Sequence, residues 1–295
     1  RMDWLSTREK KIALTVFLIA GLFVQWYGVN ANSRFDLTRS VVDHGSLNIN
    51  EVYQNAGDRS YYKGDYYSDK EPGMALLAMP IYAGWKSIYG NFGNTSIKNE
   101  PRDVMLESNN VTISYPEDPG KFYLSSLILV ILLTSTLSLS ILSILIYRIS
   151  GDFIEDERKR ILATFSFSFG TLLTHYGTMF LPNAVVTLFS FSAFYLIYKQ
   201  ETFDPKTLLY SGIIGGFAFV IDPTAAPVAG ATFVYTLMKY RQIPYIYILG
   251  GFIGALPLLI YNTVLFGYPW MLPRFFLDPA LYPNIQQSAS AIPML

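Results

Sequence analysis

Seven apolar stretches recur along this 295-residue chain, and the last six follow one another with short polar or charged connections. They limit its possible folds more than any other feature. A helix that crosses a bilayer needs about 20 mostly apolar residues. Charged residues make up only 15% of the chain, against about 25% in an average soluble domain. We therefore predict an all-α fold, a polytopic transmembrane helical bundle with about seven spans, at residues 12–29, 122–146, 161–181, 184–198, 207–221, 224–238 and 243–266.

The basic residues predict how these spans are oriented, because Lys and Arg gather in cytoplasmic loops. If the N-terminus is cytoplasmic, alternation places residues 148–160, 199–206 and 239–241 inside. These segments and the N-terminus hold 12 of the 22 Lys and Arg residues. The basic residues fall in cytoplasmic loops only if the apolar stretch at residues 74–89 does not cross the membrane. We therefore expect that stretch to form an amphipathic helix on the outer membrane surface. Its aromatic residues at headgroup level are Tyr82, Trp85 and Tyr89.

This topology leaves one long segment outside the membrane. We expect residues 30–121 to form an extracytoplasmic first loop with short surface helices, within a single transmembrane domain at residues 1–295. The chain begins at Arg1 and stops at Leu295, shortly after a polar run. We therefore expect it to be a piece of a longer protein that is truncated at its C-terminus.

Net charge and cysteine content exclude several classes of protein. The formal net charge is zero, whereas a nucleic-acid-binding protein needs a basic excess, so we expect no nucleic acid among the partners. The chain has no cysteine, which excludes a disulfide scaffold, a thiolate zinc site and a cysteine nucleophile. The first expected partner is membrane lipid.

The start of the outer loop has the pattern of a short amphipathic helix. Ser33 is a suitable N-cap, and Gly45 is a stop signal just after Asp43. Arg34 and Asp36 lie on its polar side. One interpretation is a helix that lies on the membrane face and contributes to a site. The alternative is a solvated amphipathic helix with no function of its own.

Residues 57–73 combine aromatic side chains with a dense mixture of acids and bases. Asp69, Lys70 and Glu71 directly precede Pro72, which suits the first turn of the surface helix. The start of a helix is positive by its dipole, and Lys70 adds a point charge, so together they predict a phosphate site near the membrane surface. The alternative is a loop ion pair of Asp69 with Lys70 or Arg34.

In order along the chain, these segments resemble the GT-C class of integral-membrane glycosyltransferases. The nearer relatives depend on polyprenyl-phosphate sugars: the bacterial aminoarabinose transferases that modify lipid A, and the protein O-mannosyltransferases. The resemblance rests on the helix near Arg34 followed by residues 45–47, the Tyr-Tyr-Ser-Asp-Lys-Glu-Pro run at 66–72, residues 177–183, and Tyr-Asn followed by Phe-Gly-Tyr-Pro at 261–269.

The resemblance implies particular roles for residues of this chain. Lys70 matches the family lysine that contacts the carrier phosphate, and Arg34 matches an arginine of the first loop helix. Asp69 matches an acid beside that lysine, which is a candidate ligand for a divalent metal; no other cofactor is expected. Two departures stand out: Ala31 occupies the position of the family's first-loop acid, and Asn183 stands where relatives often have Asp or His. An amide cannot act as a general base.

The resulting hypothesis is a glycosyltransferase, of hexosyl or pentosyl type, that works on the extracytoplasmic face of the cell membrane. It would move a sugar from a polyprenyl-phosphate-linked donor to a lipid, glycan or protein acceptor. One alternative is a transporter or flippase for a lipid-linked sugar or solute, although the chain lacks mid-membrane charges and inverted repeats. Another is a non-catalytic membrane scaffold. The predicted catalytic residues are Asp36, Asp69 and Asn183, and the predicted substrate-binding residues are Arg34, Tyr67, Lys70 and Arg274.

Overall fold

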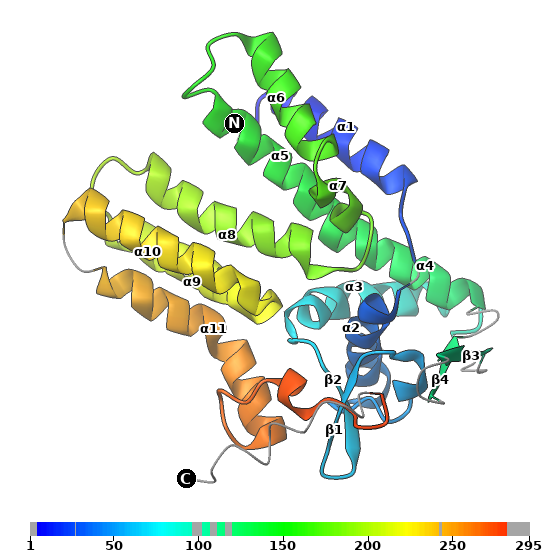
Figure 1. Cartoon of the computed structure of the whole chain (residues 1–295). Helices are drawn as coiled ribbons and strands as arrows, with labels where there is room; N and C mark the ends of the chain where they lie inside the picture. Colours follow the sequence, from blue (N-terminus) through cyan, green and yellow to red (C-terminus); the bar gives the residue numbers. More distant parts are fainter. Residues whose placement is uncertain are drawn as a thin grey trace. The chain divides into compact units, whose positions relative to one another are not determined.

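The computed structural model describes residues 5–26, 28–95, 102–106, 111–115, 120–241 and 244–281. The chain is mostly helical, and Figure 1 shows its helices and strands with their labels. It divides into two compact units. The helical unit comprises Arg1–Gln25 and Ile131–Leu256, and the mixed unit comprises Trp26–Val130 and Pro257–Leu295.

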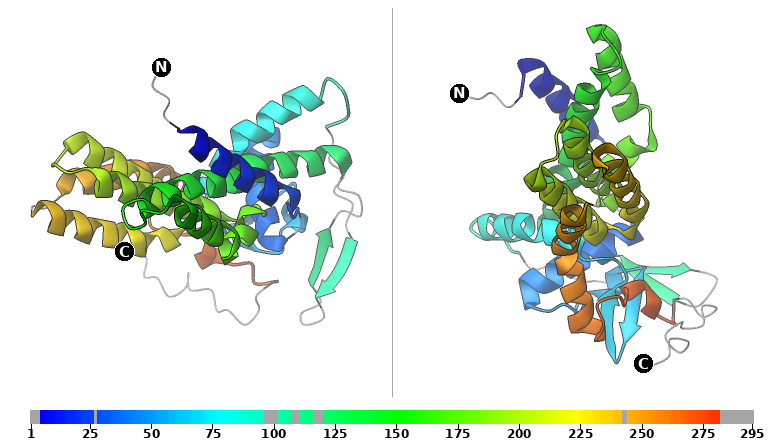
Figure 2. Two further views of the ribbon diagram at one scale, coloured as in Figure 1. Left: turned by 90° about the horizontal axis from the view of Figure 1, so that it is seen from above. Right: turned by 90° about the vertical axis from the view of Figure 1, so that its left-hand side faces the viewer.

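The helical unit consists of helices joined by short connections. In Figure 2, as in Figure 1, α8 and α9 run alongside each other, and α10 lies beside them. The elements of the helical unit are α1 (Thr7–Leu22), the π-helical segment η3 (Leu132–Thr136), α5 (Leu137–Ser150), α6 (Glu157–Phe169), α7 (Leu172–Gly177), α8 (Pro182–Lys199), α9 (Pro205–Ile221), the 3₁₀ turn η4 (Pro223–Ala225), α10 (Ala226–Tyr240) and the first part of α11 (Tyr245–Phe266).

Small residues allow α9 and α11 to pack closely. A Cβ atom added at Gly212 or Gly216 of α9 would collide with the backbone of α11, and one added at Gly250 or Gly254 of α11 would collide with that of α9. Each pair is four residues apart, so both glycines of a pair lie on one helix face. Only glycine fits this contact, which explains the spacing of the four glycines.

The predicted spans coincide with helices, with two corrections. The predicted span at 161–181 is broken, because the Thr171 hydroxyl accepts from the backbone N–H of Leu173 at 3.2 Å and starts a new helix, α7. The helix predicted at 12–29 begins at Thr7, where Ser6 and Glu9 form a capping box, and it ends at Leu22.

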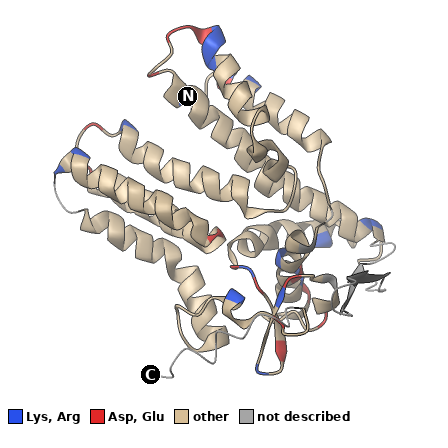
Figure 3. Cartoon of the chain, viewed as in Figure 1, with Lys and Arg blue, Asp and Glu red and all other residues tan. Residues whose placement is uncertain are grey.

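Two helices in the described part of the chain are long and apolar enough to cross a membrane. They are the continuous helix Gly120–Ser150 and α11, and Pro205–Ile221 is a shorter apolar helix. Figure 3 shows Lys, Arg, Asp and Glu at the α5–α6 and α8–α9 connections and at the end of α10, with few of them along the helices between. These features suggest an integral membrane protein, and the count of seven spans stays a prediction.

The mixed unit combines short helices with two antiparallel hairpins, which the all-α prediction did not include. Part of the predicted outer loop, residues 30–121, lies outside the described residues. The elements of the mixed unit are α2 (Val29–Arg39), the π-helical segment η1 (Ser40–His44), the 3₁₀ turn η2 (Tyr53–Asn55), β1 (Arg59–Tyr62), β2 (Asp65–Ser68), α3 (Gly73–Tyr89), β3 (Arg102–Leu106), β4 (Val111–Tyr115), α4 (Gly120–Ile131, up to Val130), the 3₁₀ turn η5 (Pro273–Phe276) and α11 from Pro257.

The helix predicted from Ser33 to Asp43 begins earlier, at Val29, after Gly28. Ser33 therefore lies inside α2 rather than at its start, and its hydroxyl bonds to another segment of the chain. The predicted stop is confirmed: η1 continues α2, and Gly45 follows with a φ of +66°, a left-handed conformation that glycine adopts without strain.

A tight hairpin anchors a distant segment of the chain. Lys63 and Gly64 both have positive φ between β1 and β2, as a two-residue hairpin turn requires. The Arg59 side chain at the start of β1 forms a buried ion pair with Asp278 at 2.7 Å, and Ser60 donates to the carbonyl of Pro273. These bonds hold residues 273–278 against the hairpin.

The apolar stretch at 74–89 is helical, as predicted, and forms α3. Its aromatic residues do not all lie at a membrane surface, however. Tyr82 is fully buried, and its hydroxyl donates to Asp43 at 2.8 Å. Trp85 donates from Nε1 to Ser125 at 3.0 Å. The placement of Tyr82 at headgroup level is therefore wrong, because this face of α3 packs inside the mixed unit.

Candidate functional site

The candidate site lies in the mixed unit, where α2 meets the end of β2. The hydroxyl of Ser33 in α2 donates to Asp69 Oδ1 at 3.1 Å and lies 3.0 Å from the hydroxyl of Ser68. The backbone N–H of Lys70 donates to the same Ser68 hydroxyl at 3.3 Å. The first-loop helix and the acid-lysine motif, which the sequence analysis assigned to one site, are therefore in direct contact.

Lys70 lies between two carboxylates. Its Nζ donates to Asp69 Oδ2 at 2.5 Å and to Asp58 Oδ2 at 3.2 Å. The ion pair predicted as an alternative to a phosphate site is thus present. When both acids are ionised, the three groups carry one net negative charge. The longer of the two contacts, to Asp58, is the weaker one and the easier for a ligand to displace.

Asp69 has an environment that changes its acidity. Its side chain is only 5% exposed. Burial raises the pKa of its carboxyl above the ordinary value, and the neighbouring Lys70 ammonium opposes that effect. A carboxylate whose pKa is raised is a stronger base than a solvated one.

Arg274 and Glu71 form a second ion pair beside Lys70 in the chain. Glu71 is fully buried, whereas the Arg274 side chain is 45% exposed. A buried carboxylate needs such a partner, because an unpaired charge in the interior is costly. The pair joins η5 to the start of α3, and it leaves much of the guanidinium accessible. We call Asp58, Asp69, Lys70, Glu71 and Arg274 the acid–base cluster.

Arg34 and Asp36 lie in α2 and face the interior. Arg34 is 5% exposed, and its Nη1 donates to the carbonyl of Asn30 at 2.9 Å. Asp36 is fully buried and pairs with Arg39 at 3.3 Å. Burial raises the pKa of Asp36 to about 7, although the Arg39 charge opposes the rise. Neither side chain has the exposure of Lys70 or Arg274.

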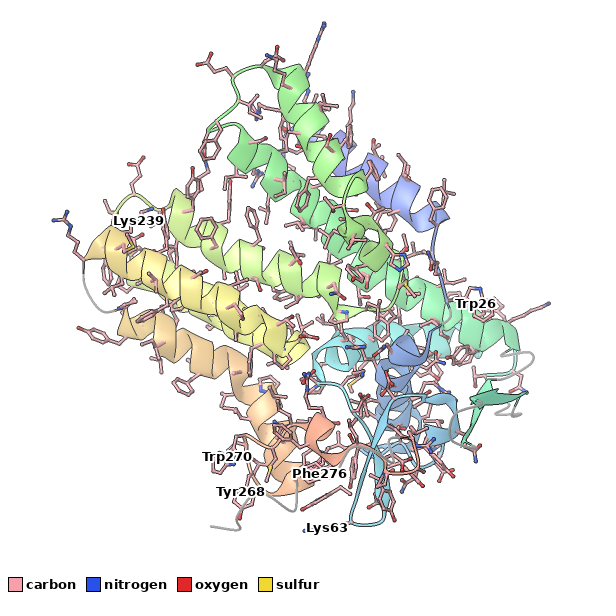
Figure 4. All side chains as sticks on the ribbon, in the orientation of Figure 1. Trp26, Lys63, Lys239, Tyr268, Trp270 and Phe276 are labelled. Atoms are coloured by element: carbon pink, nitrogen blue, oxygen red, sulfur yellow. The ribbon has the colours of Figure 1, made fainter. Side chains whose placement is uncertain are left out.

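Tyr67 belongs to an aromatic cluster rather than to an open surface. Its ring packs edge-on against Phe266 at 5.7 Å, and Phe276, which Figure 4 labels, stacks on the same Phe266 ring at 4.8 Å. Burial raises the pKa of the Tyr67 phenol, as does the carboxylate of Asp65. The cluster fixes the end of β2, from which Asp69 and Lys70 follow.

Asn183 belongs to the helical unit, at the start of α8. It lines a pocket of about 450 Å³ between α8 and η4–α10. Volumes of about 300–1,000 Å³ are typical of sites for small ligands. The other lining residues are mainly apolar: Val186, Thr187, Ser190, Phe191, Phe194, Thr224, Ala225, Val228, Ala231 and Thr232.

The residues around Asp69 do not fit a divalent metal. In the part of the chain that the structure describes, no group of three or more His, Asp or Glu side chains is placed to hold one. One oxygen of Asp69 already binds the Lys70 ammonium, and the other accepts from Ser33. A metal would have to replace that ammonium.

Sequence reasoning did not identify two of the contacts that organise the cluster. Asp58 was not assigned a role, yet it pairs with Lys70 across 12 positions. Glu71 was read as part of a helix start, but it pairs with Arg274, which lies 203 positions away. A single sequence holds no signal for pairs as distant as Asp58–Lys70 and Glu71–Arg274. The bond from the Lys70 N–H to the Ser68 hydroxyl, in contrast, joins residues two positions apart and follows from a local sequence pattern.

Comparison with known proteins gives one match. The model of a family described as dolichyl-phosphate-mannose-protein mannosyltransferase matches residues 123–261. No curated protein and no solved structure matches the chain. Asn183 lies within the matched residues, and the acid–base cluster lies outside them. Over residues 123–261 the chain is thus similar to the dolichyl-phosphate-mannose-protein mannosyltransferases, consistent with the GT-C class of membrane glycosyltransferases that its motifs resemble.

Proposed function

We propose that the full-length protein is a glycosyltransferase that moves a sugar from a polyprenyl-phosphate donor to an acceptor hydroxyl on the extracytoplasmic face. The acceptor is a lipid, a glycan or a protein. The family match and the apolar helices support a membrane glycosyltransferase. The acid–base cluster carries the proposal further, because it combines a buried carboxylate of raised pKa with two partly exposed cations.

The donor phosphate binds at Lys70 and Arg274. Each cation is held on one side by carboxylates and is exposed on another, 16% for Lys70 and 45% for Arg274. The helix α3 starts at Gly73 without a side-chain cap, so the amides of its first turn and its dipole add to the attraction for an anion. The phosphate displaces Asp58 from Lys70, since that contact is the longer one.

Asp69 acts as the general base. The acceptor oxygen attacks the anomeric carbon, and its proton passes to the Asp69 carboxylate. The bond between that carbon and the phosphate oxygen breaks, and the electron pair stays on the polyprenyl phosphate. Lys70 and Arg274 stabilise the charge that develops there. The ammonium of Lys70 also orients the base.

The remaining predicted residues take supporting roles in this proposal. Arg34 and Asp36 are buried in α2, so they hold the helix whose Ser33 binds Asp69, rather than touch the donor. Tyr67 fixes the end of β2. Asn183 lines the pocket of the helical unit, and its catalytic role stays a prediction.

Transfer from a labelled polyprenyl-phosphate sugar by the full-length protein in membranes tests the proposal. Lys70→Ala removes the phosphate contact and takes the ammonium away from the buried Asp69, so transfer should fall about 100-fold, as for truncation of a buried charge pair. The control is Lys86→Ala, which breaks a pair with Asp43 in the same unit and should leave transfer within about twofold of wild type. Lys70→Ala transfer equal to wild type would overturn the phosphate assignment.

A further inference from the structure

Exposed cations lie at the starts of two neighbouring helices of the helical unit. Lys11 lies near the start of α1, and Arg158 and Lys159 lie in the first turn of α6. An ion pair between Arg8 of α1 and Glu157 of α6 joins the two helix starts. Figure 3 shows the charges of α6 beside the α5–α6 connection. We call Lys11, Arg158 and Lys159 the basic patch.

Most acids at this end of the unit are occupied within the protein. Glu9 binds Arg148 of α5 at 2.5 Å, and Glu157 is held by Arg8. Asp156 caps α6 by accepting from two backbone N–H groups at 2.8 and 3.2 Å. In the described part of the chain, no ion pair joins the basic patch to an acid. Residues 8–11, 148 and 155–160 hold seven Lys and Arg against four acids, so this end is net positive.

Two of these cations occupy a place that disfavours positive charge. Arg158 and Lys159 are the second and third residues of α6. The start of a helix is positive by its dipole, so a cation there is unfavourable and an anion is favourable. An anion from outside the protein would pair with both side chains and would also complement the helix dipole.

Exposed apolar side chains continue from the basic patch along both helices. Leu14 and Leu18 follow Lys11 by three and seven residues, so they lie on its face of α1, and they are 57% and 55% exposed. Leu162 follows Arg158 by four residues and is 67% exposed. A cation at the end of an apolar face suits a partner that has both a phosphate and hydrocarbon chains. A water-soluble anion would match the cations alone.

We propose that the basic patch binds the headgroup of an anionic phospholipid, whose acyl chains lie along the exposed leucines of α1 and α6. The headgroup phosphate pairs with the cations. The net positive charge of this end selects an anionic headgroup, such as that of phosphatidylglycerol, over the zwitterionic headgroup of phosphatidylcholine. This surface belongs to the helical unit and goes beyond the proposed transfer reaction, because it needs no donor or acceptor.

Titration of the full-length protein in detergent with each lipid tests the proposal. Native mass spectrometry gives the dissociation constant of the first bound phosphatidylglycerol and of the first bound phosphatidylcholine. Wild type should bind phosphatidylglycerol at least about 10-fold more tightly, as expected for two or more basic residues at a membrane surface. The double change Lys11→Gln with Arg158→Gln removes one cation from each helix. It should remove most of this preference and leave phosphatidylcholine binding within about twofold of wild type.

The matched control is the double change Lys206→Gln with Arg241→Gln. Both residues are exposed bases at other connections of the same unit, so the control removes the same charge elsewhere. It should leave the preference within about twofold of wild type, because exposed charges at a distance are screened. The exchange Lys11→Arg with Arg158→Lys keeps both charges and should keep the preference.

Three results would overturn the lipid surface. The first is equal affinity of wild type for the two lipids, and the second is an equal loss of preference in the control and in the Lys11 and Arg158 double change. The third is a preference that persists at about 1 M salt, where the screening length falls to about 3 Å and charge can no longer select the headgroup. Sugar transfer is measured in none of these titrations, so their failure leaves the proposed function standing.

Discussion

The two units bury different kinds of polar side chain. In the helical unit the buried polar residues are mainly Ser and Thr, and their hydroxyls donate to backbone carbonyls. Thr136 bonds to Gly177, Ser211 to Ala193 and Thr236 to Thr232. The mixed unit instead buries charged side chains, which are Arg34, Asp36, Arg39, Arg59, Asp69, Glu71 and Asp278.

The buried hydroxyls of the helical unit serve helix packing, whereas the buried charges of the mixed unit suit a functional site. A buried hydroxyl that donates to a backbone carbonyl has its hydrogen bond within the protein, so it costs little free energy. Helices that carry such hydroxyls can therefore pack in an apolar medium. A buried charge is expensive unless it is paired, and perturbed acids gather at functional sites. The family match covers mostly the helical unit, and the acid–base cluster lies outside it. The family resemblance and the site are therefore supported by separate parts of the chain.

Removing one charge from the mixed unit should have the largest effect on sugar transfer. Asp69→Asn keeps the shape of the side chain and one of its two acceptor oxygens but removes the base. The rate constant kcat for sugar transfer should fall about 10²- to 10⁴-fold, with little change in donor KM. Steady-state kinetics with a labelled polyprenyl-phosphate sugar give both constants.

Asp43→Asn is the control for that change. Asp43 also lies in the mixed unit and pairs with Lys86 at 2.6 Å, but it is not part of the acid–base cluster. If Asp43→Asn lowers kcat as much as Asp69→Asn does, the loss reflects stability of the unit, and Asp69 is not the base.

The helical unit should respond to a packing change instead. In Gly254→Ala the new Cβ meets the backbone of α9, which cannot move without opening the contact. Overpacking of this kind costs about 1–3 kcal/mol, so thermal unfolding in detergent should begin several degrees lower. Gly230→Ala on α10 is the matched change, because an added Cβ there meets nothing within 4 Å. Equal unfolding temperatures for the two variants would show that the glycines are not required for packing.

A smaller effect, of opposite sign, is expected at Asp58. Its carboxylate competes with the donor phosphate for Lys70, so Asp58→Asn should strengthen binding of polyprenyl phosphate about threefold. This corresponds to a modest hydrogen-bond free energy. Competition binding with a labelled lipid phosphate measures the change. Weaker binding in Asp58→Asn would mean that Asp58 orients Lys70 rather than competing for it.

The smallest effect concerns pH. In the folded chain the pKa of Asp36 is about 7, well above the ordinary value of 3.8. The folded state therefore holds this proton more tightly than the unfolded state. The resulting stability is complete below about pH 4 and is lost as the pH rises through 7. Wild type should lose more thermal stability than Asp36→Asn between pH 5 and pH 7.5. A pH-independent difference between the two unfolding temperatures would contradict the raised pKa.

The sequence predicts the helices well because their signals are local. Apolar runs predict the positions of the helices in the helical unit, although one run contains both α6 and α7. The break before α7 was missed although Gly170 and Thr171 carry a local stop and cap signal. Tyr82 was misplaced because an apolar helix pattern does not say whether lipid or protein covers it.

The candidate site was predicted only in part, for a different reason. The contact of Asp69 with Lys70 is between neighbours in the chain and was considered from the sequence. The bonds of Ser33 to Asp69 and of Glu71 to Arg274 join segments that are far apart. Their formation depends on how the hairpin, α2 and η5 pack, which no local pattern specifies.

Photolabelling tests the central claim, that the mixed unit binds the donor phosphate, most directly. The probe is a polyprenyl-phosphate sugar with a photoreactive group next to the phosphate, applied to the full-length protein in membranes. The labelled peptides should contain residues 67–74 and 272–276. Excess polyprenyl phosphate and the Lys70→Ala change should each abolish the labelling. Labelling confined to peptides of the helical unit, or unaffected by Lys70→Ala, would contradict the assignment of the phosphate to the acid–base cluster.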